Sequence, residues 1–170
     1  MSGVSIDGES VLLRPVAREV ARELLAGRAP AGIRFADGYP SPFSLEVMDL
    51  LAGKRAAEAG PGFCSWFVVR RDDGAVVGEI GYGLHEQSGL ATVGYSIVEP
   101  CWGRGYATDA LVALLGRMRT DPRVLRIEAT APVAHVASRR VMEKAGMALC
   151  DSRLEEVDGV LVELAVYRLG

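Results

Sequence analysis

Two glycines flank an arginine where the chain changes from strand-like to helix-like spacing. The stretch "WGRGYAT" (residues 102–108) follows an alternating run and directly precedes an apolar helical pattern. Gly103 and Gly105 lack Cβ atoms, so the backbone N–H groups of a sharp turn there stay open to a ligand. The first turn of the following helix adds N–H groups without partners and the positive end of the helix dipole. The stretch is therefore a candidate anion site, although a plain tight turn explains the same residues equally well.

The loop differs from the familiar nucleotide-binding motifs. A phosphate-binding loop of the NTPase type needs Lys after its last glycine, and Tyr106 stands there. A dinucleotide-binding fold places three glycines early in a parallel βαβ unit, whereas this loop lies in the middle of the chain, after antiparallel strands. Both of these nucleotide-binding classes are excluded.

Length, charge and cysteine content narrow the classes of protein. The 170 residues are expected to form a single domain spanning residues 1–170. The net charge is −3 with scattered lysines and arginines, which argues against a nucleic-acid partner. No apolar run approaches the roughly 20 residues of a membrane helix, and the first ten residues lack a secretion signal. Cys64, Cys101 and Cys150 have no close spacing and predict free thiols, no metal site and a cytoplasmic location; Cys101, beside the glycine loop, is either reactive or a buried bystander.

Hydrophobic periodicity predicts the elements that position the loop. Strands are expected at 10–16, 64–71, 75–84, 90–100, 125–133, 148–156 and 160–169, and helices at 17–27, 43–60, 107–118 and 134–146. Gly27 and Gly146 are expected to end helices, Ser44 to begin one, and Asp158-Gly159 to form a hairpin turn. This order predicts an α/β (α+β) fold with a mixed, mostly antiparallel sheet of six to seven strands flanked by four helices.

Two motifs make the chain similar to the GNAT superfamily of N-acetyltransferases. "CWGRGYA" resembles that family's [RQ]-x-x-G-x-[GA]: Gly103, Gly105 and Ala107 match, while Pro100 or Cys101 replaces the Arg or Gln. "GYSIVEPCWGRGYATDAL" and "AHVASRRVMEKAGM" resemble the branch of ribosomal-protein N-terminal acetyltransferases. The resemblance extends over nearly the whole chain and implies acetyl-coenzyme A (acetyl-CoA) as co-substrate.

The resemblance also implies how acetyl-CoA is held. Strand 90–98 would separate from strand 125–131, and the pantetheine arm would pair in the gap with backbone groups of Ile97 and Val98. The Val98 N–H would polarise the thioester carbonyl. The pyrophosphate would lie over the backbone of the glycine loop and the helix start, which comprise Gly103, Arg104, Gly105, Tyr106, Ala107 and Thr108. The Arg104 side chain either adds charge there or points to solvent.

The implied reaction is direct attack of a primary amine, either a protein N-terminus or a small amine, on the thioester. The departing thiolate needs a proton donor. Met142 stands where many relatives place a tyrosine acid, so the resemblance assigns this role to Ser138. His135 replaces the family asparagine, and is either a donor to the ligand and a catalytic acid or only a polar residue at a helix start.

A general base is harder to assign. Thr92 stands where the similar branch often has glutamate, so Glu79 on the preceding strand is the first choice. His85 and Glu86 in the next turn are the alternatives, and all three are also explained as solvated surface groups.

The acceptor is expected over the loop 29–42, a long segment rich in proline and glycine. Phe35, Tyr39 and Phe43 would line its pocket or, alternatively, hold two helices to the sheet. The expected function is therefore an acetyl-CoA-dependent N-acetyltransferase, and the alternative is a non-catalytic acyl-CoA sensor or interaction module. Relatives commonly dimerise, so the resemblance points to a homodimer.

Overall fold

Nine strands and five α-helices make up the computed structural model, which describes residues 3–170. The strands are β1 (Ile6–Asp7), β2 (Val11–Pro15), β3 (Arg34–Phe35), β4 (Phe63–Arg70), β5 (Ala75–His85), β6 (Leu90–Ile97), β7 (Arg126–Pro132), β8 (Met147–Val157) and β9 (Val160–Leu169). The helices are α1 (Arg18–Leu25), α2 (Pro42–Ala52), α3 (Ala56–Ala59), α4 (Tyr106–Met118) and α5 (Val136–Lys144), with a 3₁₀ turn at Glu99–Cys101.

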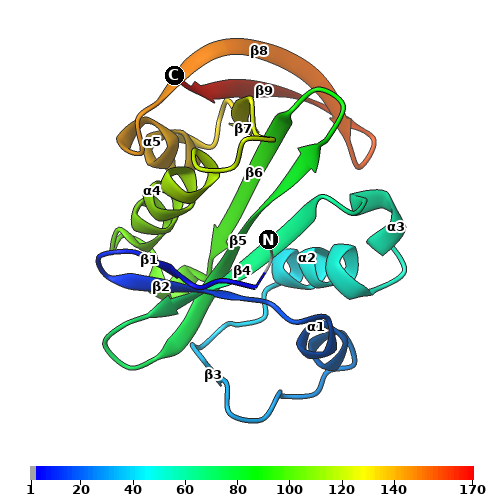
Figure 1. Ribbon diagram of the computed structural model, residues 1–170, viewed down its shortest axis with the longest axis vertical. Coiled ribbons are helices and arrows are strands. Elements are labelled where there is room, and N and C mark those ends of the chain that lie inside the picture. Colours follow the sequence, from blue (N-terminus) through cyan, green and yellow to red (C-terminus); the bar gives the residue numbers. More distant parts are fainter. Residues whose placement is uncertain (1–2) are drawn as a thin grey trace.

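All strands belong to one sheet, in the order β1-β2-β4-β5-β6-β7-β9-β8, with β3 beside β5. Every pair along this order is antiparallel except β6 and β7, and the short β3 is parallel to β5. In Figure 1, α4 and α5 lie on one side of the strands and α1 to α3 on the other. The predicted mixed, mostly antiparallel α/β fold is confirmed.

Strands β6 and β7 separate after a short stretch of pairing. The parallel ladder joins Leu90–Val93 to Arg126–Ala129 and then stops. The remaining residues of β6, 94–97, and of β7, 130–132, diverge and leave a gap in the sheet. The separation implied by the family resemblance is therefore present.

Glycine and aspartate fix several of the element ends that the sequence predicts. Gly27 and Gly146 follow α1 and α5 with φ of 70° and 87°, the left-handed conformation that ends a helix with little strain. Asp158 and Gly159 join β8 to β9 with φ of 51° and 78°, as expected for a two-residue hairpin turn.

The second predicted helix differs from the expectation at both ends. Helix α2 begins at Pro42, and its N-cap is Ser41 rather than Ser44. The Ser41 Oγ accepts the Ser44 N–H at 3.1 Å, so Ser44 is the third residue of a capping box. The helix stops at Gly53, and α3 is a separate short helix. Strands β1 and β3 were not predicted, because two residues are too few to show an alternating pattern.

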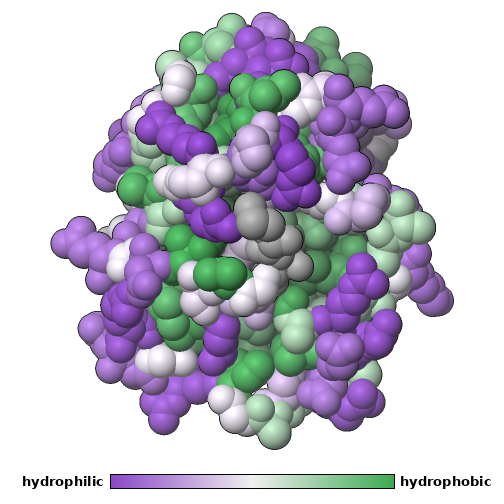
Figure 2. Space-filling view, in the orientation of Figure 1, coloured by the Kyte–Doolittle hydropathy of each residue, from purple (hydrophilic) through white to green (hydrophobic). Residues whose placement is uncertain are grey.

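Apolar side chains fill the interfaces between the sheet and its helices. Phe67 and Ile80 of the central strands, Met48 of α2 and Leu111 of α4 are each at most 1% exposed. On the face shown in Figure 2, most residues at the edge are hydrophilic, and hydrophobic residues lie between them. None of the helices within residues 3–170 is long and apolar enough to cross a membrane.

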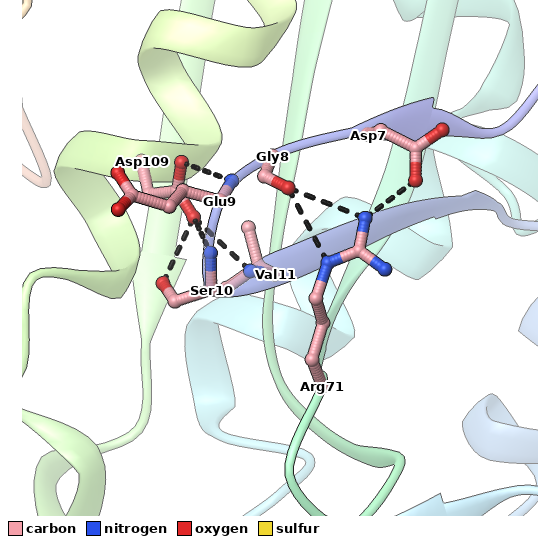
Figure 3. Close-up of polar contacts among 7 residues, drawn as sticks. All are labelled: Asp7, Gly8, Glu9, Ser10, Val11, Arg71 and Asp109. Atoms are coloured by element: carbon pink, nitrogen blue, oxygen red, sulfur yellow. Dashed lines mark hydrogen bonds and ion pairs between the residues drawn. The ribbon is translucent and has the colours of Figure 1, made fainter.

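Asp109 ties the first turn of α4 to the N-terminal hairpin (Figure 3). Its carboxylate accepts hydrogen bonds of 2.6–3.0 Å from the backbone N–H groups of Glu9, Ser10 and Val11. The Ser10 hydroxyl donates a further bond at 2.8 Å. At Gly8 an added Cβ would lie 2.9 Å from the Asp109 carboxylate. These contacts hold the beginning of α4, and with it the glycine loop, against the sheet.

Candidate active site

A cavity of about 700 Å³ opens where β6 and β7 separate. Its walls are the end of β6, the glycine loop with the first turn of α4, the end of β7 and one face of α5. The volume falls within the usual range for a small-molecule site. Nine of the residues predicted to bind acetyl-CoA line it: Ile97, Gly103, Arg104, Gly105, Tyr106, Ala107, Thr108, His135 and Ser138.

The glycine loop presents open backbone to this cavity. Gly103 and Gly105 have φ of 73° and 80°, which side-chain-bearing residues rarely adopt. A Cβ at either position would have no protein atom within 4 Å, so the space above the turn is free. Helix α4 has no side-chain cap, and its first backbone bond runs from Asp109 N to Gly105 O at 3.0 Å. The N–H groups of the loop and first turn can therefore donate hydrogen bonds to an anion.

The charged side chains around the cavity carry only positive charge. Arg104, Arg140 and Lys144 line it, and none of its lining residues is Asp or Glu. Within residues 3–170 these three cations form no hydrogen bond or ion pair with the chain. A cavity with three unpaired cations and open amides favours a polyanionic ligand.

The prediction that the Val98 N–H polarises the thioester carbonyl is wrong. The Val98 N–H donates to Val77 O on β5 at 2.9 Å, and Val98 does not line the cavity. It is therefore not free to polarise a carbonyl there. Backbone direction alternates along a strand, so the N–H and C=O of Ile97 face the cavity instead. The Ile97 carbonyl accepts a hydrogen bond from the Trp102 indole N–H.

Ser138 and His135 reach the cavity from α5. The Ser138 hydroxyl lies 3.1 Å from the Tyr95 hydroxyl, which also donates to the Ser138 carbonyl at 2.9 Å. His135 is exposed at the N-cap position of α5, where its side chain makes no capping bond. Both side chains are thus placed to meet a ligand in the cavity.

Glu79 lies outside the cavity lining and is only 1% exposed. It stands opposite Ser96 in the β5–β6 register, but its carboxyl lies near Tyr39 and near Ser44 of α2, and so on the sheet face that α2 covers. Burial raises the pKa of its carboxyl to about 7 although these two hydroxyls act to lower it. Neither hydroxyl donates a hydrogen bond to Glu79: the Ser44 hydroxyl bonds within the capping box to Ser41, and the Tyr39 hydroxyl and both carboxyl oxygens are buried without a partner. The structure does not bring this carboxyl to the cavity.

The other candidate bases lie further along the sheet. His85 and Glu86 are exposed near the turn that precedes β6, whereas the cavity is at the opposite end of that strand. The His85 Nδ1 is 3.1 Å from the Ser88 hydroxyl, a contact within the same turn. Neither residue lines the cavity.

The three aromatic residues predicted for the acceptor pocket divide into two groups. Phe35 and Tyr39 stack with ring centroids 5.2 Å apart, and both meet Phe67 edge-on. Neither lines the cavity, and this packing matches the alternative in which they hold the loop and helices to the sheet. Phe43, at the start of α2, does line the cavity and is 45% exposed.

Sequence reasoning missed Tyr95, Arg140 and Lys144 as cavity residues. One signal was available: residues 137, 140, 141 and 144 follow helical spacing, so Arg140 and Lys144 share a face of α5 with Ala137. No local pattern indicates the partner of Tyr95, because that partner lies 43 residues away.

Fold and site together define an α/β protein with a cationic cavity between two diverging strands. The acetyltransferase (GNAT) domain family matches residues 10–148. The chain belongs to this family and carries its acetyltransferase domain. A relative from Bacillus subtilis (strain 168), the uncharacterized N-acetyltransferase YjdG, is 28% identical over 89 residues. That match spans 52% of this chain and 53% of the relative, about half of each.

Solved structures share the fold over almost the full chain. RimL, a ribosomal L7/L12 alpha-N-protein acetyltransferase in complex with coenzyme A, superposes with a TM-score of 0.72 at 16% identity, covering 97% of both chains. A GNAT-family acetyltransferase from Bacillus anthracis gives 0.68 at 18% identity and 98% of both chains. A chimera of the spermidine N-acetyltransferase SpeG from Vibrio cholerae with hSSAT gives 0.69 at 14% identity and 95% of both chains. At these identities the likeness concerns the fold.

Proposed function

We propose that the protein transfers an acetyl group from acetyl-CoA to a primary amine. The observation that carries the proposal is the convergence of open glycine-loop amides and three unpaired cationic side chains on one cavity between diverging strands. Acetyl-CoA carries several phosphate charges and an extended arm, which suit a positively charged cavity beside unpaired strand backbone. The family assignment supports the same ligand.

The residues of the cavity fit separate parts of this co-substrate. The N–H groups from Gly103 to Thr108 would hold the pyrophosphate, with Arg104 adding positive charge. The Ile97 backbone would pair with the pantetheine arm. Acetyl-CoA supplies an acetyl group activated as a thioester.

Ser138 is our proposed hydrogen-bond donor to the departing thiolate, and His135 is a second candidate. The acceptor amine must be neutral to attack. A protein N-terminus has a pKa near 8, so a water molecule suffices to take up its proton, whereas a lysine-like amine needs more assistance. Phe43, the aromatic residue that lines the cavity, is the proposed acceptor contact.

One observation favours the alternative of a non-catalytic acyl-CoA sensor. None of the lining residues of the cavity is a carboxylate, and Glu79 is buried away from it. A sensor would bind acetyl-CoA but release no coenzyme A thiol with any amine. An acetyltransferase would release thiol with at least one acceptor.

The first experiment is a thermal-shift titration with acetyl-CoA, coenzyme A and NAD. A ligand that binds only the folded state adds about 2.7 kcal/mol at 100 times its dissociation constant. Stabilisation by acetyl-CoA and not by NAD is the expected result, and no shift with acetyl-CoA would contradict the proposal. Thiol release is then measured with peptides bearing free N-termini, polyamines and amino sugars.

Single-domain organisation, cytoplasmic location and a homodimer remain part of this proposal. The three cysteines are free thiols, which suits a reducing compartment. Sedimentation velocity of the full chain tests the dimer, and a monomer at every concentration would contradict it.

A further inference from the structure

Tyr95 connects the two sides of the gap in the sheet. It belongs to β6 beyond Val93, the last residue paired with β7, yet its hydroxyl reaches α5. It donates to the Ser138 carbonyl at 2.9 Å and lies 3.1 Å from the Ser138 Oγ. Both side chains line the cavity. The Tyr95 hydroxyl thus contacts both the carbonyl oxygen and the side-chain hydroxyl of Ser138, whose side chain lines the cavity.

The Tyr95 hydroxyl keeps the proton that it needs to donate a hydrogen bond. Tyr95 is half-buried, and burial raises the pKa of its phenol although the bond from Ser138 acts to lower it. The phenol therefore stays protonated at neutral pH. Met142, one turn further along α5 than Ser138, is buried and carries no proton to donate.

The pair contains two hydroxyl protons, and their arrangement decides what the serine can do. When the phenol proton points at the Ser138 carbonyl, the phenol oxygen can accept the serine proton, and the serine offers none to the cavity. When the phenol proton turns to the Ser138 Oγ, the serine proton is free to point at a ligand. Both acceptors lie within hydrogen-bond distance of the phenol, so this change needs only rotation of hydroxyl groups.

We propose that Tyr95 is a positioning residue: when its proton turns from the Ser138 carbonyl to the Ser138 Oγ, it directs the Ser138 proton to the sulfur of coenzyme A. The inference rests on the proposed function. In the reaction a C–N bond forms and the C–S bond breaks, and the proton lost by the amine balances the proton gained by the thiolate. Tyr95 and Ser138 transfer no proton between them; they stabilise the sulfur while it carries negative charge.

The test measures the bound sulfur directly, without acetyl transfer. The pKa of the coenzyme A thiol is titrated in the complex by the ultraviolet absorption of the thiolate. Affinities for coenzyme A and desulfo-coenzyme A are measured by calorimetry at a pH where the bound thiol is ionised. The variants are Tyr95→Phe, Ser138→Ala and the double variant. Tyr82→Phe is the matched control, because it removes a phenol hydroxyl outside the cavity lining.

Ser138→Ala should raise the pKa of the bound thiol and reduce the preference for coenzyme A over desulfo-coenzyme A by about tenfold, the loss expected for one hydrogen bond to a charged group. Tyr95→Phe should change both readouts in the same direction, and the double variant should lose no more than Ser138→Ala alone. Tyr82→Phe should match the wild type. The cationic and titratable neighbours His135, Arg140 and Lys144 are common to all these proteins.

A Tyr95→Phe protein that binds coenzyme A with the wild-type thiol pKa and the wild-type preference would overturn the inference while leaving the proposed function intact. A Ser138→Ala protein with unchanged readouts would overturn it as well. Wild-type protein that binds neither coenzyme A nor desulfo-coenzyme A would instead overturn the proposed function, and this inference with it.

Discussion

The Glu79 carboxyl lies between β5 and α2, and neither of its oxygens has a hydrogen bond. Burial disfavours its charged form, which raises its pKa from an ordinary value of 4.5 to about 7. The Tyr39 hydroxyl beside it is also buried without a hydrogen bond. At this residue, ionisation and folding are therefore coupled near neutral pH.

Glu79→Gln should remove a pH dependence of stability. The unfolded carboxyl ionises from about pH 4.5, whereas the folded one stays protonated to about pH 7, so the free energy of unfolding of the wild type falls across this window. The difference corresponds to roughly 3 kcal/mol. The variant should match the wild type near pH 4 and exceed its stability by up to about 3 kcal/mol at pH 8. Denaturant titrations at several pH values measure this.

Two results would count against this account. An equal decline in the stability of both proteins between pH 4.5 and 7 would assign the effect to another group. Loss of acetyl transfer in a stably folded Glu79→Gln protein would show that Glu79 serves as the base after all. Retained transfer would make it a structural residue.

At the scale of elements, the glycine loop and the first turn of α4 form one unit with two roles. The loop faces the cavity, and Asp109 in the same turn holds the N-terminal hairpin. Loop conformation and hairpin anchoring can be tested separately.

Gly105→Ala should abolish most coenzyme A binding while the domain stays folded. The substitution places a Cβ in the open space above the turn and strains a left-handed residue by about 1–2 kcal/mol. Gly74→Ala is the control, because Gly74 has φ of 71° in the β4–β5 turn and equally open surroundings. Calorimetry should show at least a roughly tenfold loss of affinity only in Gly105→Ala. Equal affinities would exclude the loop as the phosphate site.

Asp109→Ala should destabilise the protein by about 2 kcal/mol, because the carboxylate accepts several backbone hydrogen bonds. Burial alone would raise the pKa of this carboxyl, but the bonds from Glu9, Ser10 and Val11 lower it below its ordinary value of 3.8. Its stabilisation is therefore present above pH 4 and is lost as the pH falls through the lowered pKa. Thermal unfolding should show the deficit at pH 7 and a progressively smaller one as the pH falls through the lowered pKa of Asp109. Asp72→Ala, a change at an exposed turn residue, should show no such deficit at any pH.

Local chemistry explains which elements the sequence could predict. Gly27, Gly146 and Asp158-Gly159 each adopt a conformation that favours their residue type, so their roles could be recognised without tertiary contacts. Alternation along "AVVGEIGYGL" could not assign the face of Glu79, because both faces of β5 are covered. The stacking of Phe35 on Tyr39 and the contact of Tyr95 with Ser138 depend on pairing between distant segments, which periodicity does not encode.

At the scale of the whole molecule, a chain of net charge −3 presents a cavity whose charged lining groups are all cationic. The excess of acidic residues lies elsewhere on the molecule. Attraction of a phosphate-bearing ligand is therefore a local property of this cavity.

Arg140→Ala and Lys144→Ala should each weaken coenzyme A binding several-fold at low ionic strength and less in high salt, since these side chains are exposed. Pantetheine, which lacks the phosphates, should bind all variants equally. Lys54→Ala provides the control, because Lys54 lies between α2 and α3 and does not line the cavity. An equal loss for pantetheine would show that the two residues act through the shape of α5 and not through charge.

The short ladder between β6 and β7 joins two parts of the molecule by few backbone hydrogen bonds. Four residue pairs join these strands, whereas ten join β8 to β9 and eight join β5 to β6. A partial opening that separates β7–β9 and α5 from the rest breaks few backbone bonds, so the amide hydrogens bonded between β6 and β7 should exchange well before those of the central strands, whereas β7 amides bonded to β9 stay protected. A molecule bound between β6 and β7 would hold the two parts together and suppress this partial opening, so that they unfold in one step.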